Sequence, residues 1–350
     1  MAKKRARKNN NKVLIAVAVI VLLILVTVII VLYKTDRLEN IIDGILKETQ
    51  QGGDNDDTPP SDRNESRGDS YGVIDGSPIK IHFVSVGQGD AIVIELPGNE
   101  YMLVDAGSGA TAYPSSTIKN RYYSYLSDVV DGDEIDYLVV THPDSDHVNM
   151  MSKVVDDYVV KNFYYNAYAD SSKTYATFTA KAAAEEDAAL HVIDTADSSR
   201  FNIAAGGCTL TFYSPGNDGF TSSEAKIKNG MSIMIMLEYG GRKLLLTGDA
   251  PEEEEEWFVA YTEYENTDVD FLKVAHHGSP YSSTTEFLSY VSAEYAVISV
   301  DESNNSYGHP SPDTLERLEN ASATVYRTDI KGTIVLTIDS DGDYAFTFVE

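Results

Sequence analysis

The sequence predicts an α/β domain, an αββα sandwich of two face-to-face sheets with helices outside, preceded by one transmembrane helix and a disordered linker. Three observations predict this organisation. A charge-free apolar run lies near the amino terminus, and a polar segment rich in Gly, Pro, Asp and Ser follows it. Beyond that segment, short apolar runs alternate with helical patterns and no solenoid repeat occurs.

The amino-terminal region predicts a membrane anchor. Residues 1–12 are a basic tail without acids, and residues 13–33 are an apolar segment long enough to cross a bilayer. Because basic residues favour the cytoplasmic side, we expect a single-pass protein of the cell membrane, with its amino terminus in the cytoplasm and its main domain extracellular. The alternative is a cleaved signal peptide, although such a peptide normally has a shorter apolar region that ends in small residues.

The next two segments connect this anchor to the folded domain. Residues 34–51 predict an amphipathic stalk with apolar side chains at helical spacing, and self-association through this stalk is one expected partner interaction. Residues 52–78 contain almost nothing apolar and predict a disordered linker. The folded domain is therefore expected over residues 79–350.

The strands of this domain are predicted from apolar runs bounded by turn residues, such as Gly240-Gly241 between the two strands of a hairpin. The helices are predicted from apolar residues at helical spacing. The predicted strands are residues 79–86, 91–96, 101–107, 136–140, 161–168, 191–195, 208–215, 231–239, 243–249, 271–278, 295–300, 323–328 and 333–339. The predicted helices are residues 117–130, 148–159, 179–190, 251–264, 285–291 and 311–319.

Charge and cysteine content limit the classes of partner. The net charge is −28, and the six basic residues of the tail precede the first acid. A surface this acidic repels nucleic acid and anionic lipid unless bound cations or a basic patch offset it. The acidic run in PEEEEEW is interpreted as a solvated first helical turn. The only cysteine, Cys208, excludes an intrachain disulfide and is expected in the core.

The segment THPDSDH, residues 141–147, follows a predicted strand and predicts a metal site. Its candidate ligands are His142, Asp144, Asp146 and His147. A rigid sheet aims such loops, and imidazoles and carboxylates are ligands of divalent metals. In the alternative interpretation, Asp144 or Asp146 caps the following helix, and this motif alone supports both equally.

Further polar residues follow other predicted strands. They are Asp105, Asp249, His276, His277 and His309. Together with His142 and His147, five of the seven His of the chain follow predicted strands in this way. Each residue alone could be a turn former or a cap. Independent caps would not require this shared position, so the combined pattern favours a dinuclear metal site.

Several segments carry a family resemblance. They are FVSVGQGDAIVIEL, YMLVDAG, LVVTHPDSDH, NGMSIMIMLEYGGRKLLLTGD, FLKVAHHGSPYSS, AVISV and NNSYGHPSPDTLERL. In this order they resemble the metallo-β-lactamase-fold domain of the competence protein ComEC and its free-standing relatives, over about residues 79–338. The resemblance implies a metal-dependent hydrolase. It does not include the multi-helix channel region of ComEC, so no DNA-uptake channel is implied.

The resemblance also implies the metal ligands. The family pattern HxHxDH reads HxDxDH here, so His142 and Asp144 would serve the first metal ion, and Asp146 and His147 the second. Asp249 would bridge both ions. Either His277 or His276 would complete the second site, and we assign His277 to it.

Two departures from the family pattern concern the first metal site. Asp144 replaces a His, and the only His between His147 and Asp249 is His191, so Lys228-Asn229-Gly230 stands where a ligand would be expected. The expected cofactors are two divalent ions, Zn²⁺ or Mn²⁺. Because oxygen ligands suit harder ions, the first site should prefer Mn²⁺ or Mg²⁺ or hold its ion weakly.

Other residues are assigned to the surroundings of the metal ions. Asp105 would orient a ligand His. Asn229 and Ser279 would offer donors nearby. Gln88 and Asp90 of VGQGD would line the site, although Gly-Gln-Gly-Asp is equally an ordinary turn.

The candidate catalytic residues are Asp146, His276 and His309, where His276 or His309 would supply a proton or bind phosphate.

The expected function is a membrane-anchored, outward-facing phosphodiesterase or nuclease, because two cations suit an anionic phosphodiester, with DNA as one candidate substrate. Two alternatives stay open. One is a hydrolase of carbon esters or lactones on the same fold, and the other is a non-catalytic binding module.

Overall fold

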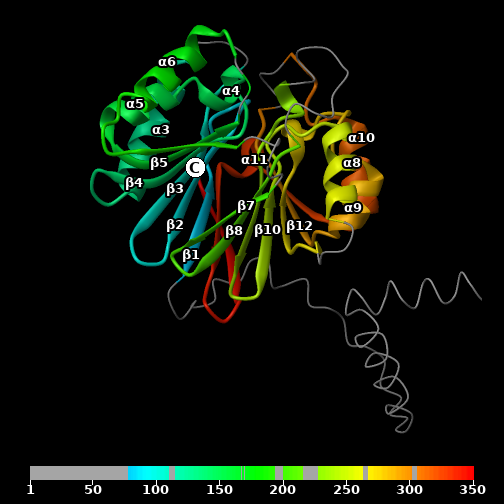
Figure 1. Ribbon diagram of the computed structural model, residues 1–350. Coiled ribbons are helices and arrows are strands. Elements are labelled where there is room, and N and C mark those ends of the chain that lie inside the picture. The colour runs from blue at the N-terminus through cyan, green and yellow to red at the C-terminus, as the bar shows by residue number, and fades with distance from the viewer. Residues whose placement is uncertain are drawn as a thin grey trace, which may run out of the picture. The chain divides into compact units, whose positions relative to one another are not determined.

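The computed structural model describes residues 78–109, 115–166, 168, 170–193, 200–215, 228–262, 267–301 and 306–350. The predicted tail, anchor and stalk, and the linker up to residue 77, lie outside these residues. Within the described part of the chain, no helix combines the length and apolar character needed to cross a membrane. The described residues form two sheets with helices on their outer faces (Figure 1).

The first sheet has eight strands in the order β15-β14-β1-β2-β3-β4-β5-β6. Strands β15 to β3 pair antiparallel, and β3 to β6 pair parallel. The bounds are β1 Ile79–Phe83, β2 Ala91–Leu96, β3 Glu100–Ala106, β4 Glu134–Val140, β5 Val159–Asn166, β6 Ala189–Ile193, β14 Thr333–Ile338 and β15 Tyr344–Val349.

The second sheet has seven strands in the order β13-β12-β11-β10-β9-β8-β7. Its strands β10 to β13 pair parallel, and β7 to β10 pair antiparallel. The bounds are β7 Arg200–Ala205, β8 Cys208–Tyr213, β9 Met234–Tyr239, β10 Arg242–Leu246, β11 Phe271–Lys273, β12 Tyr295–Ile298 and β13 Thr324–Arg327.

The helices cover the outer faces of the sheets, which agrees with the parallel pairs, because parallel strands need crossover connections. Figure 1 shows α3, α5 and α6 beside the first sheet and α8, α9 and α10 beside the second. The bounds are α3 Ser116–Val129, α4 Ser145–Val148, α5 Met151–Asp157, α6 Lys173–Ala182, α8 Glu252–Tyr261, η2 Ala275–Gly278, α9 Thr285–Val291, α10 Pro312–Asn320 and α11 Thr328–Lys331.

Three apolar clusters hold these layers together. One lies between the two sheets and contains Phe83, Phe212 and Phe271, together with the predicted core residue Cys208. A second packs α3, α5 and α6 on the first sheet, and a third packs α8, α9 and α10 on the second. The predicted αββα sandwich is therefore confirmed for the described residues.

Several predicted elements differ from the structure. The helix predicted at residues 179–190 is wrong: α6 begins at Lys173, with Ser172 capping Tyr175 N, and ends at Ala182. The Ala-rich residues after it turn, and Ala189–Ile193 pairs with β5, because sheet pairing outweighs helix propensity there. The edge strands β7 and β15 were not predicted.

The helix predicted at 148–159 is shorter in the structure, where α5 covers Met151–Asp157, and a separate short helix, α4, precedes it over Ser145–Val148. The strand predicted at 271–278 ends at Lys273, and η2 follows. The acidic run is not a solvated turn, since Glu254 and Glu255 are fully buried. Glu255 accepts hydrogen bonds from the backbone N–H groups of Ser283 and Thr284, the latter at 2.9 Å.

A close backbone approach brings two loops of the first sheet together. Asp90 N donates to Asp146 O at 3.1 Å, and Gly107 N donates to Asp90 O at 2.9 Å. A Cβ atom at Gly107 would collide with the backbone of Asp146 and His147. Glycine is therefore required where the loop after β3 meets the loop after β4.

Gly107→Ala should cost about 3 kcal/mol of unfolding free energy or more, the upper end of overpacking effects, because the Asp146–His147 backbone must move. Urea unfolding of the purified protein measures this change. The control is Gly98→Ala, where a Cβ meets nothing within 4 Å and only the positive φ of 93° is penalised. We expect about 1 kcal/mol there, and equal losses in both variants would contradict the packing argument.

Candidate metal centre

The predicted ligand loops meet at the carboxyl ends of the parallel strands. Asp105 lies at the end of β3, and THPDSDH follows β4. From the second sheet, Asp249 follows β10 and His277 follows β11. Carboxyl ends of parallel strands are where open α/β sheets bind ligands, because polar loops from several strands gather at one edge there.

Asp249 divides the surrounding ligand atoms into two groups. Its Oδ1 atom lies 3.2 Å from His147 Nε2 and 3.6 Å from His277 Nε2. Its Oδ2 atom lies 3.8 Å from His142 Nε2 and 3.6 Å from His276 Nε2. One carboxylate therefore faces two clusters of nitrogen donors, one with each oxygen.

We call the Oδ1 group the second-metal side and the Oδ2 group the first-metal side. Asp146 joins the second-metal side, with Oδ2 3.7 Å from His277 Nε2. Asp144 joins the first-metal side, with Oδ2 3.9 Å from His142 Nε2. Asp144 occupies the N-cap position of α4 but its side chain makes no capping hydrogen bond, so capping does not explain this residue.

Asp105 fixes the orientation of His147. Its Oδ2 atom lies 2.7 Å from His147 Nδ1 and accepts a hydrogen bond from Thr141 Oγ1 at 2.6 Å, and its Oδ1 atom accepts one from Thr141 N at 2.8 Å. With Nδ1 held by the carboxylate, Nε2 of His147 points at Asp249. A carboxylate behind an imidazole is a usual way to orient a metal-binding His.

A strained turn presents His276 and His277 to the two oxygens of Asp249. Both residues are left-handed, with φ of 50° and 53°, a conformation that costs a non-glycine residue about 1 kcal/mol or more. His277 Nδ1 lies 2.9 Å from Ser299 O, so it donates there and leaves Nε2 as the acceptor. The turn thus aims consecutive side chains at opposite sides of one carboxylate.

Burial and neighbouring charges raise the pKa of some of these groups and lower the pKa of others. Burial opposes the charged form of His147, but Asp249 and Asp105 outweigh it and raise the pKa of His147 well above its ordinary value. Burial lowers the pKa of His277 to about 4, and it raises the pKa of Asp146 to about 7. Without a metal ion, the two carboxylates therefore favour the protonated form of His147.

The buried polar atoms test whether these residues suit a metal ion. Among the described residues, the Nε2 atoms of His142, His147 and His277 and the Oδ1 atom of Asp249 are buried without a hydrogen bond. Each such atom ordinarily costs about 1–3 kcal/mol. Because they converge and are imidazole and carboxylate donors, the residues fit divalent metal ions.

A buried ion pair beside the second-metal side includes a residue that sequence reasoning missed. Lys273 is fully buried at the end of β11, and its Nζ lies 3.0 Å from Asp90 Oδ2. Burial disfavours the carboxylate of Asp90, but Lys273 and His277 outweigh it and lower its pKa. Only its position at a strand end, like that of the predicted ligands, could have pointed to Lys273.

The remaining predicted residues lie around these groups. Asn229 Nδ2 lies 3.4 Å from His276 Nε2, and the ring of His309 lies 5.4 Å from that of His276. Gln88 is buried in the loop before Asp90. Ser279 supports the turn rather than the ligand atoms, since its N–H donates to His276 O at 2.9 Å.

His191 is not part of this cluster. Its ring stacks on Tyr164 with centroids 4.4 Å apart, and its Nε2 lies 3.3 Å from Asn162 Oδ1. In the described chain, no further His therefore joins the first-metal side.

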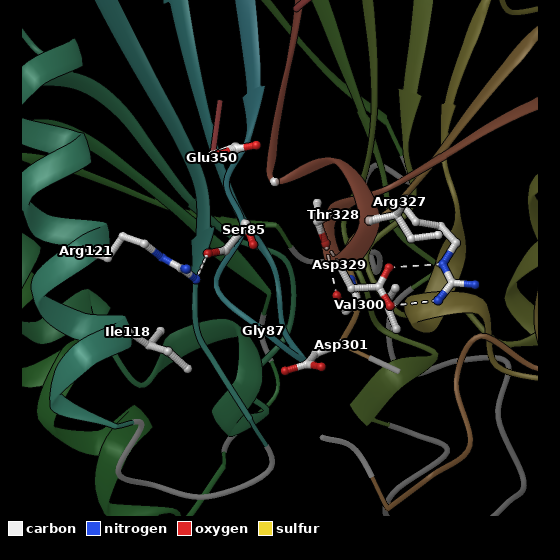
Figure 2. Close-up of a pocket in the computed structure, with 12 residues that line it drawn as sticks. Ser85, Gly87, Ile118, Arg121, Val300, Asp301, Arg327, Thr328, Asp329 and Glu350 are labelled. Carbon is white, nitrogen blue, oxygen red and sulfur yellow. Dashed lines mark hydrogen bonds and ion pairs between the residues drawn. The ribbon is translucent and has the colours of Figure 1, made fainter. Parts of the chain in front are cut away.

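A cavity of about 750 Å³ is lined by residues that include Gly87, a sequence neighbour of Gln88 (Figure 2). None of its lining residues is a candidate metal ligand. Its arginines are engaged: Arg121 donates to Ser85 O, and Arg327 pairs with Asp329 through two hydrogen bonds. Asp301, Asp329 and Glu350 add negative charge. This lining gives the cavity no clear preference for an anion.

Comparisons with known proteins find a matching family and several similar proteins. The family described as "Metallo-beta-lactamase superfamily" matches residues 84–301. ComE operon protein 3 of Bacillus subtilis is 28% identical over 73% of this chain and 32% of its own length. Recombination protein 2 of Haemophilus influenzae is 24% identical over 75% of this chain and 29% of its own length. Competence protein ComA of Neisseria gonorrhoeae is 36% identical over 33% of this chain and 16% of its own length.

The chain therefore spans no more than 32% of the length of these relatives. Solved structures are also similar. They include CmlA, a diiron beta-hydroxylase from Streptomyces venezuelae, at 12% identity, TM-score 0.46, and 79% and 55% coverage of the two chains. Zn²⁺-bound PqqB from Methylobacterium extorquens has 12% identity and TM-score 0.45, covering 75% of this chain and 99% of PqqB.

Asp105→Asn should weaken metal binding about 10- to 100-fold, the usual loss when the partner of a ligand His is altered. The amide keeps the size of the side chain but removes the charge behind His147 Nδ1. Competition with a chromophoric chelator measures the Kd. Asp128→Asn, an exposed change on α3, is the control, and an unchanged Kd for Asp105→Asn would refute the orienting role.

Zn²⁺ binding to the metal-free protein at about pH 7 should release protons. His147 has a raised pKa and is protonated without metal, whereas a ligand imidazole must be neutral. Metal affinity should therefore fall as pH falls below the pKa of His147, and protonation of Asp146 near pH 7 adds in the same direction. Calorimetry in two buffers of different ionisation enthalpy detects the release, and identical heats would contradict it.

Proposed function

Since the chain belongs to the metallo-β-lactamase superfamily, whose fold is that of metal-dependent hydrolases, we propose that it is a membrane-anchored, outward-facing phosphodiesterase or nuclease. The observation that carries this proposal is Asp249, whose two oxygens face separate groups of imidazole nitrogens. A carboxylate in this position suits two cations held close together, which is a usual arrangement for cleaving phosphodiesters.

The residues that would hold the metal ions are those grouped around Asp249. Asp146, His147 and His277 would hold one metal ion, and His142 and Asp144 would face the second cation, with Asp249 shared between the two sides. Bound divalent ions lower the pKa of water and neutralise anionic substrate oxygens. The protein contributes the orientation of the donors: Asp105 holds His147, and Ser299 O holds His277.

Two further histidines lie where a proton could be exchanged with the substrate. The side chain of His276 is partly exposed beside Asp249 Oδ2, so it can reach both the centre and solvent. Burial lowers the pKa of His309 to about 4, which makes this ring neutral at physiological pH. We therefore assign proton delivery to the leaving group to His276, and hydrogen bonding to substrate to His309.

The substrate class is supported by the relatives and by the rim of the centre. The relatives are named as competence and recombination proteins, and DNA is the phosphodiester that those names indicate. Tyr307 is 55% exposed and its ring stacks near that of His309, at 5.7 Å between centroids. An exposed aromatic ring beside the centre suits stacking on a nucleobase.

The net charge of −28 opposes binding of a long nucleic acid, so we favour short single strands or nucleotides over long duplex DNA. We place the domain outside the cell membrane, anchored by residues 13–33, because that segment is apolar and follows a basic tail.

Asp249→Ala should abolish hydrolysis of bis-p-nitrophenyl phosphate and of single-stranded DNA by the Mn²⁺-loaded protein, with at least about a 10²-fold loss of kcat/KM, because both sides of the centre lose a shared ligand. Assays with Mn²⁺, Zn²⁺ and Mg²⁺ measure it. The matched control is Asp128→Asn on α3.

Metal binding without any phosphodiester turnover in the wild type would overturn the proposal. Turnover of a carbon ester or lactone would then favour the ester hydrolase, and no turnover of either would favour a binding module.

A further inference from the structure

The two sides of Asp249 differ in how deeply their candidate metal ligands are buried. On the second-metal side, Asp146, His147 and His277 are at most 16% exposed and converge on Oδ1. On the first-metal side, His142 is buried, but Asp144 is 34% exposed and His276 is 29% exposed. The first-metal side is therefore the more open one.

A lysine lies beside the carboxylate of that open side. Lys228 Nζ lies 3.6 Å from Asp144 Oδ1, within ion-pair distance. The other oxygen of Asp144 faces His142. Asp144 is thus shared between an imidazole and an ammonium.

A second carboxylate fixes the position of this ammonium. Lys228 also pairs with Asp170, whose side chain is 3% exposed and accepts a hydrogen bond from Ser172 N at 2.6 Å near the start of α6. The loop that carries Lys228 is held as well, because Asn166 Nδ2 donates to Met231 O at 2.9 Å and to Thr141 O at 3.0 Å. Lys228 is therefore held over the first-metal side from two directions.

An ammonium at this position and a divalent cation on Asp144 would repel each other at short range, in surroundings less polar than water. We infer that the ammonium of Lys228 takes the place of the first metal ion, so that the centre holds one metal ion tightly, on the second-metal side. Given the proposed function, the same ammonium serves as the positive charge that contacts a non-bridging oxygen of the phosphodiester.

Metal content tests this inference without any substrate. The full chain is purified in mild detergent, stripped with a chelator, loaded with Mn²⁺ and desalted. Elemental analysis counts the retained ions, and electron paramagnetic resonance distinguishes isolated from spin-coupled Mn²⁺. We expect about one ion per chain in the wild type, with an isolated spectrum.

Lys228→Gln should raise the retained Mn²⁺ to about two ions per chain, with spin coupling and at least about tenfold tighter binding of the second equivalent. Lys228→Arg keeps the charge and should resemble the wild type. The matched control is Lys161→Gln, which also removes an ammonium shared by two carboxylates, Glu134 and Asp136, but on the surface. Two tightly held ions in the wild type, or no gain in Lys228→Gln, would overturn the inference.

Asp144→Asn gives an independent test if Lys228→Gln does not fold, as judged by circular dichroism. If Lys228 occupies the first-metal side, Asp144→Asn leaves the Kd of the tightly held ion unchanged. If the wild type holds about one ion and Asp144→Asn weakens the binding of that ion tenfold or more, Asp144 is one of its ligands and the inference is refuted. These readouts hold even if no phosphodiester is cleaved, so failure of the proposed function is distinguishable.

Discussion

The collection of buried carboxylates between the two sheets is the constraint on which this centre depends. Asp90, Asp105 and Asp249 are buried, and the side chain of Asp146 is 16% exposed. Buried anions are costly unless cations or hydrogen bonds compensate them. Neighbouring groups compensate these carboxylates. Lys273 forms an ion pair with Asp90, Thr141 and His147 contact Asp105, and imidazoles surround Asp249.

This compensation also explains why the two sides of Asp249 differ. On the second-metal side the neighbours of Asp249 Oδ1 are the imidazoles of His147 and His277, and a bound metal ion can replace the proton on His147. On the first-metal side, Lys228 already brings a positive charge to Asp144. The chemical difference between a His and an Asp at position 144 therefore extends to its neighbour, because a carboxylate attracts an ammonium that an imidazole would not.

The backbone is distorted where the loops must approach closely. His276 and His277 adopt left-handed conformations, and Gly107 packs directly on the backbone of Asp146 and His147. Such strain persists only when the surrounding structure holds it, as the parallel strands and their outer helices do here. The rigid layers thus support the precise placement of donors from loops of both sheets.

The sequence by itself determined the αββα class, most strands and helices, and the loops that carry ligand residues, because these follow from local periodicity and from polar residues at strand ends. It did not determine the start of α6, the edge strands β7 and β15, or the burial of Glu254 and Glu255, which depend on pairing and packing with distant segments. Only the tertiary structure decided which side chains of the centre contact one another. His277 rather than His276 joins Asp146, Lys273 neutralises Asp90, and Lys228 reaches Asp144, because each contact joins loops far apart in the chain.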